Sequence, residues 1–95
     1  MTEQKRGMLM PKPRGKDGEK NLIGARLIQL RKENNYSQRT LAYALQLHGY
    51  DIDKNVITRI ETNKRYVTDI ELKALSELFH VSYDYLIDGT EPDKK

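Results

Sequence analysis

Four Ser, Thr or Asp residues each stand directly before a run of residues with helical apolar spacing: Ser37, Asp53, Thr68 and Ser82. A short polar side chain in this place accepts a hydrogen bond from a free N–H group of the first turn and so favours the start of a helix. No stretch of useful length alternates apolar and polar residues in the way a half-buried strand does. The sequence therefore predicts an all-α fold built from short helices.

Five helices are expected. Ile23, Leu27 and Leu30 fall at i, i+4 and i+7 and predict a first helix from Leu22 to about Asn34. The second is expected to follow Ser37 and to run to Leu47 before Gly49. The others are expected at 54–61 with Ile57 and Ile60 inward, from 69 through Phe79, and from 83 to about 87 before Gly89.

Length and composition bound the class of protein. Ninety-five residues make one small domain, and the absence of cysteine excludes disulfides and Cys-based metal sites. No apolar run is long enough to span a bilayer, and the basic N-terminus lacks the apolar stretch of a secretory signal. We therefore expect a cytoplasmic protein without a membrane partner, divided into a flexible basic arm (1–20), a helical domain (21–89) and a short charged tail (90–95).

Positive charge is concentrated in the first two thirds of the chain. Residues 1–20 carry six Lys/Arg against three Asp/Glu, residues 21–65 carry eight against four, and residues 66–95 carry three against seven. A polyanion would be drawn to one end of the molecule only. Pro11, Pro13 and three glycines predict that residues 1–20 are disordered, either as an arm that contacts phosphates or a minor groove, or as an end without a role.

The order of these pieces resembles the Cro/cI-type (XRE-type) helix-turn-helix family of phage-repressor-like regulators. The residues that carry the resemblance are Leu30-Arg31, Ser37-Gln38, Leu41-Ala42, Ile57-Thr58-Arg59-Ile60-Glu61 and the closing run Val81 to Gly89. The resemblance implies a compact five-helix, lambda-repressor-like DNA-binding domain whose partner is double-stranded DNA. It implies no cofactor and no metal.

In this family the start of the third helix reaches base edges while the second helix crosses the DNA backbone. By position, the resemblance makes Lys54, Asn55 and Arg59 the base-reading residues, with Thr58 as a secondary one. Arg and Lys suit guanine, and Asn suits adenine. It likewise implies phosphate contacts for Gln38, Arg39, Lys64 and Arg65. The alternative for all of these residues is an ordinary solvated helix surface.

The resemblance also implies structural roles for other residues. Arg31 and Glu61 match a pair that forms a salt bridge between the first and third helices. Asn63 stands where the family usually has glycine, in a place that suits a left-handed backbone, which Asn tolerates. The spacing from Ala42 to Glu61 is about five residues longer than usual. This lengthened connection makes the tilt of the third helix an open question.

Tyrosines are numerous in the chain. Tyr36, Tyr43 and Tyr66 are expected to pack at helix ends rather than to stack on bases. The cluster Tyr83, Tyr85, Leu86 and Ile87 in the last helix is expected to close the core, to form a two-fold dimer contact, or to do both. A homodimer would bind half-sites about 34 Å apart.

Enzyme chemistry finds little support in the sequence. His48 and His80 lie far apart and have no Cys or H-x-x-x-H spacing beside them, so neither is expected to bind a metal. We therefore expect no enzyme but a sequence-specific regulator, a repressor that binds a near-palindromic operator as a homodimer. The alternatives are a protein-interaction module of the antitoxin or anti-repressor type and non-specific nucleic-acid binding through the arm. Control of such a small chain is expected to come from a regulatory protein partner, from the level of the protein or from its degradation.

Overall fold

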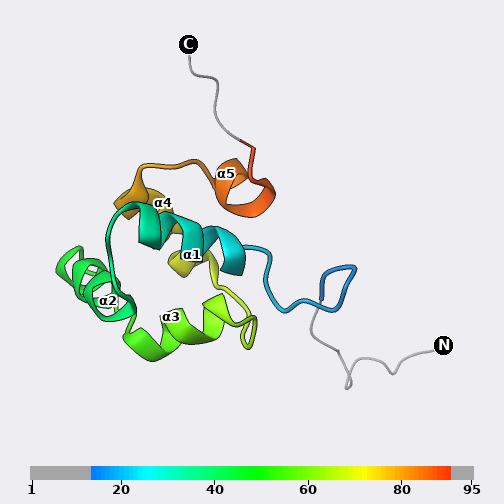
Figure 1. Cartoon of the computed structure of the whole chain (residues 1–95), viewed down its shortest axis with the longest axis horizontal. Coiled ribbons are helices and arrows are strands. Elements are labelled where there is room, and N and C mark those ends of the chain that lie inside the picture. Colours follow the sequence, from blue (N-terminus) through cyan, green and yellow to red (C-terminus); the bar gives the residue numbers. More distant parts are fainter. Residues whose placement is uncertain (1–13, 91–95) are drawn as a thin grey trace, which may run out of the picture.

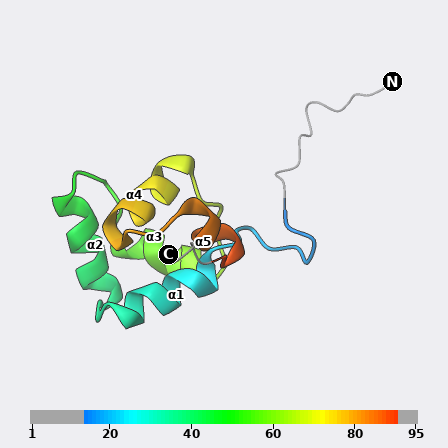
Figure 2. The same cartoon turned by 90° about the horizontal axis from the view of Figure 1, so that it is seen from above.

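The computed structural model describes residues 14–90, which contain helices and no strand. The helices are α1 (Gly24–Glu33), α2 (Gln38–Leu47), α3 (Lys54–Glu61), α4 (Asp69–Phe79) and α5 (Tyr83–Asp88). In Figure 1, α3 forms the lower edge of the domain, α5 lies at the opposite edge and α1 lies between them. Figure 2, the view from above, shows α2 at one side of this group. The expected all-α, five-helix fold is confirmed.

Four helices begin as their capping residues predict. Ser37 accepts a hydrogen bond from the Thr40 N–H at 3.0 Å, and Asp53 accepts one from the Val56 N–H at 2.9 Å. Thr68 and Ser82 cap α4 and α5 in the same manner. These bonds satisfy N–H groups that have no partner within the helix.

The first helix begins two residues later than predicted. Leu22 is exposed and non-helical, and Ile23 precedes α1 without a side-chain cap of its own. Instead, Oδ1 of the buried Asn21 accepts hydrogen bonds from the N–H groups of Ile23 and Gly24, at 3.1 and 2.9 Å. The apolar stripe predicted the position of this helix. It did not show that the side chain of Asn21 accepts hydrogen bonds from the free N–H groups at the start of the helix.

A left-handed residue follows each helix: Asn35, Gly49, Asn63, His80 and Gly89. At the end of α2, the Gly49 N–H donates to Gln46 and the Tyr50 N–H donates to Leu45, both at 3.0 Å. This is the Schellman arrangement, which satisfies the last carbonyls and turns the chain sharply. The predicted roles of Gly49 and Asn63 are confirmed by φ values of +93° and +60°.

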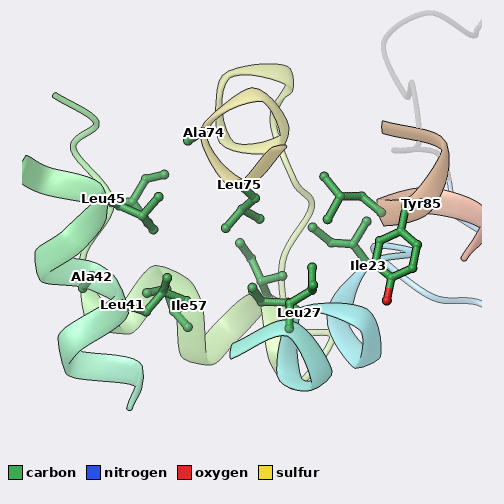
Figure 3. Close-up of a cluster of buried hydrophobic side chains, with 13 residues drawn as sticks. Ile23, Leu27, Leu41, Ala42, Leu45, Ile57, Ala74, Leu75 and Tyr85 are labelled. Carbon is green, nitrogen blue, oxygen red and sulfur yellow. The ribbon is translucent and has the colours of Figure 1, made fainter. Parts of the chain in front are cut away.

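The core gathers residues from all five helices. Its largest fully buried side chains are Leu27, Leu41, Leu45, Ile57, Ile60 and Leu86. Figure 3 shows Leu41 and Leu45 of α2 pointing toward Ile57 of α3, with Leu75 of α4 on the facing side. Each such side chain contributes roughly 1.5–3 kcal/mol by leaving water. The inward positions predicted for Ile57 and Ile60 are confirmed.

Of the cluster expected in the last helix, two residues close the core. Tyr85 is 7% exposed and Leu86 is 0% exposed, because α5 turns both into its own core. The guanidinium of Arg26 lies over the Tyr85 ring at 5.0 Å. Tyr85 and Leu86 are therefore core residues, whereas Tyr83 and Ile87 are exposed.

The long connection between α2 and α3 folds back onto the protein. Ile52 is 4% exposed and belongs to the core, and its carbonyl accepts a hydrogen bond from Gln46 at 3.2 Å. The Tyr50 hydroxyl donates to the Glu77 carboxylate of α4 at 2.6 Å. The lengthened connection is thus held to the rest of the protein at Tyr50 and at Ile52.

The expected N-terminal arm is described only in part. Its residues 1–13, like residues 91–95 of the tail, lie outside the described residues. Within 14–20, the Gly15 N–H donates to Glu19 at 2.9 Å, and the Lys20 N–H donates to Oδ1 of Asn63 at 2.6 Å. The chain therefore reaches α1 by way of the end of α3.

Candidate nucleic-acid interface

One face of α3 points to solvent and carries polar side chains. Lys54, Asn55 and Arg59 are exposed, while Ile57 and Ile60 on the other face are buried. The exposed residues are the three that were predicted to read bases. The structure brings them together on one helix face, even though the connection before α3 is long.

A hydrogen-bonded network fixes α3 against α1 and α2. Arg31 binds Glu61 through two bonds, from Nε at 2.7 Å and from Nη2 at 3.1 Å. Glu61 also accepts a bond of 2.9 Å from Nε2 of Gln38, in the first turn of α2. The Arg31 and Glu61 side chains are only 13% and 4% exposed, so the charges are screened little by water. Each of the three helices supplies one member of this network.

Gln38 uses both ends of its amide in this network. Its Oε1 accepts a bond of 2.9 Å from the Thr58 hydroxyl, which also lies 3.0 Å from the Lys54 carbonyl. An amide NH₂ group has two N–H donors, so Gln38 keeps one after its bond to Glu61. Thr58 has committed its only hydroxyl proton within the protein and offers a base only its methyl group and an acceptor oxygen.

The outer side of α2 adds cationic and aromatic groups beside the start of α3. Arg39 is exposed and, with Tyr43, Gln46 and Lys54, lines a shallow hollow between the two helices. Tyr43 is 65% exposed, so the expectation that it packs at a helix end is wrong. Its position in the middle of α2, two residues from buried Leu41 and Leu45, places its ring toward solvent.

A second hollow lies at the opposite end of α3. Its lining residues are Lys20, Arg59, Lys64, Arg65, Tyr66 and Thr68. Arg65, a predicted phosphate contact, donates from Nη1 to Glu71 at 2.7 Å and is partly neutralised by that carboxylate. Lys64 is exposed.

Sequence reasoning missed Lys20 and Asn21 at this end of α3. Asn21 directly precedes the first apolar stripe, which is an N-cap signature that could have been recognised. Nothing local indicates that Lys20 meets Asn63, because the two are 43 residues apart in sequence.

The described residues 14–90 contain no cluster of metal-binding side chains. His48 lies at the end of α2, with Nδ1 3.1 Å from the Ala44 carbonyl, and His80 is the left-handed residue after α4. In the same part of the chain, every helix is too short or too polar to cross a membrane.

A family model described as helix-turn-helix matches residues 27–86, which span α1 to α5. The chain belongs to this helix-turn-helix family, of the XRE (Cro/cI) type. The family is a DNA-binding regulatory one and not an enzyme family, and the chain is accordingly a DNA-binding transcription regulator. No curated protein and no solved structure matches the chain significantly.

Proposed function

We propose that the protein is a cytoplasmic transcriptional repressor that binds a near-palindromic operator in double-stranded DNA as a homodimer. The observation that carries the proposal is the exposed face of α3, with Lys54, Asn55 and Arg59 held on a helix that α1 and α2 fix in place. Side chains of these types on a helix held in place suit base edges in a major groove. Repression would follow from occlusion of a promoter.

Phosphate contacts would orient α3 in the groove without specifying sequence. Gln38 suits this role because its free amide N–H is aimed by the bonds to Glu61 and Thr58. Arg39 on α2 and Lys64 after α3 flank the recognition face at its two ends. Arg65 would contribute less, since Glu71 shares its charge.

The proposed homodimer contact uses exposed apolar groups away from α3. Tyr83 and Ile87 of α5 are 47% and 38% exposed, and Ile70 at the start of α4 is also exposed. Ile70 and Tyr83 line one hollow together with Leu72. An apolar surface of this kind supports association between copies. A two-fold axis there would leave both α3 helices free for half-sites about 34 Å apart.

The test begins with selection of bound sequences from a random double-stranded DNA pool. A near-palindromic consensus is expected, and anisotropy titration on it should give an affinity that falls steeply with salt because phosphate binding releases counterions. A scrambled duplex of equal length is the control. Equal affinity for consensus and scrambled duplexes would refute operator recognition.

The exposed apolar surface of α4 and α5 also suits a protein partner, so the rival function is a protein-interaction module of the antitoxin or anti-repressor type. The double variant Lys54→Ala and Arg59→Ala separates the two. Loss of operator binding at an unchanged melting temperature would support the repressor function. Retained operator binding would argue against α3 as the DNA-binding helix.

A further inference from the structure

The segment before α1 and the segment after α3 are bound to each other through two asparagines. Asn63 accepts a bond of 2.6 Å from the Lys20 N–H and donates one of 3.0 Å to the Asn21 carbonyl. Asn21 in turn donates from Nδ2 to the carbonyls of Ile60 and Arg65, at 3.1 and 3.0 Å. We call this set of bonds the Asn21–Asn63 clamp. It fixes the backbone of Lys20 at the carboxyl end of α3.

The clamp brings three cations to one hollow. Lys20 arrives from the N-terminal segment, Arg59 from α3 and Lys64 from the turn that follows. Among the described residues, no ion pair joins any of these three side chains to an acid. The nearby carboxylate of Glu71 is already bound to Arg65. Three like charges in one hollow, unpaired within residues 14–90, favour a bound anion.

The position of this hollow next to α3 indicates which kind of anion it binds. It begins at Arg59, on the exposed face of α3, and continues past the end of that helix to Lys20. In Figure 1 residues 14–20 (blue) lie beyond the carboxyl end of α3. A polyanion that lies along α3 would therefore pass directly over this hollow.

We propose that Lys20 and Lys64 together hold one phosphodiester group of the DNA backbone, at the edge of the groove that Arg59 enters. This inference rests on the proposed function. Lys20 is a new contact that the helix-turn-helix unit itself does not contain. Because phosphate contacts position a protein and base contacts specify, the bound phosphate sets the register of Arg59 on the bases.

The test compares Lys20→Ala with Lys73→Ala in the full chain, on the selected operator and on the scrambled duplex. Lys73→Ala is the matched control because it removes the same charge from an exposed position of α4. There Lys73 pairs with Glu77 at 3.4 Å. Loss of one phosphate contact lowers the slope of log affinity against log salt by about 0.9. Lys20→Ala should therefore bind both duplexes roughly five- to tenfold more weakly at 0.1 M salt. Lys73→Ala should keep the wild-type slope.

A second variant tests the clamp without a change of charge. Asn63→Gly removes both side-chain bonds to the N-terminal segment, and glycine adopts the φ of +60° without strain. The slope of log affinity against log salt should become smaller, as for Lys20→Ala, although every lysine is retained. If Asn63 had a purely structural role, the substitution would change the melting temperature and leave the slope of log affinity against log salt concentration unaltered.

The outcomes separate this inference from the function on which it rests. Equal slopes for Lys20→Ala, Lys73→Ala and wild type would overturn the phosphate site, while preference for the operator over the scrambled duplex would leave the proposed function standing. Absence of operator preference in the wild type would refute both. If Asn63→Gly does not fold, the Lys20→Ala slope decides alone.

Discussion

The Tyr50 hydroxyl lies 2.6 Å from the Glu77 carboxylate and ties the connection between α2 and α3 to the last turn of α4. The two residues are 27 positions apart. The hydrogen bond from Tyr50 lowers the pKa of Glu77 from its ordinary value of 4.5, with a smaller contribution from Lys73. The same bond raises the pKa of Tyr50 above its ordinary value of 10.0.

We predict that Tyr50→Phe returns the pKa of the Glu77 carboxyl toward its ordinary value. A carboxyl whose folded pKa is lowered stabilises the fold above its unfolded pKa and loses that contribution as pH falls through the folded pKa. Wild type should therefore lose more stability than Tyr50→Phe below about pH 4.5. Carboxyl NMR titration measures the shift, with Tyr43→Phe as control. An unchanged Glu77 pKa would contradict the bond.

Arg31→Ala should destabilise the fold strongly. The substitution leaves Glu61 charged at 4% exposure without its ion pair, which costs about 3–5 kcal/mol for a well-buried pair. Urea unfolding measures the loss, and the exposed neighbour Lys32→Ala should remain within about 0.5 kcal/mol of wild type. A wild-type unfolding curve for Arg31→Ala would refute the structural role of the pair.

Gly24→Ala should force α1 away from α3. An added Cβ would lie 2.7 Å from the Ile60 carbonyl, a backbone atom that cannot yield as a side chain can. Overpacking of this kind costs about 1–3 kcal/mol. The measurement is thermal unfolding, with Ala25→Ser at the adjacent exposed position as control. Equal melting temperatures of Gly24→Ala and wild type would show that the two helices have room to separate.

Gly49→Ala should cost about 1 kcal/mol through backbone strain, because φ is +93° and no neighbouring atom lies near the added Cβ. Gly49→Asn should cost less, since Asn tolerates left-handed conformations better. Denaturant titration of both variants checks the order. The reverse order would mean that strain at Gly49 does not limit stability.

Asn55→Ala should relax specificity at one base pair of each half-site. A good bidentate contact contributes about 1–3 kcal/mol of discrimination, and Asn55 is exposed near the start of α3. Competition among operators changed at single positions measures this loss. Uniform weakening at all positions would instead make Asn55 a phosphate contact.

Local features of the sequence predicted much of the fold. Ser37, Asp53, Thr68 and Ser82 each cap a helix, because capping depends on residues within one turn. The bounds of α3 follow from Asp53 and from the inward spacing of its isoleucines. The family resemblance paired Arg31 with Glu61, and the two side chains are in contact.

Features set by distant partners could not be predicted. The Asn21–Asn63 clamp joins residues more than forty positions apart, and nothing in either neighbourhood selects the other. In α5, six residues are too few for an apolar stripe to show that Tyr85 and Leu86 face the core while Tyr83 and Ile87 do not. For Thr58, its position in the family resemblance suggested base contact, and only the position of Gln38 shows that its hydroxyl proton is already committed.

The burial of Ile52 has a consequence for how this domain can change. Ile52 is anchored in the core and Asp53 caps α3, so the start and direction of α3 depend on these two adjacent residues. Residues 48–51 before them are mainly exposed. A change of Ile52 or Asp53 would thus redirect α3 without touching any residue of its exposed face. The last residues of the connection therefore determine how the DNA-facing helix is presented, although they lie outside that helix.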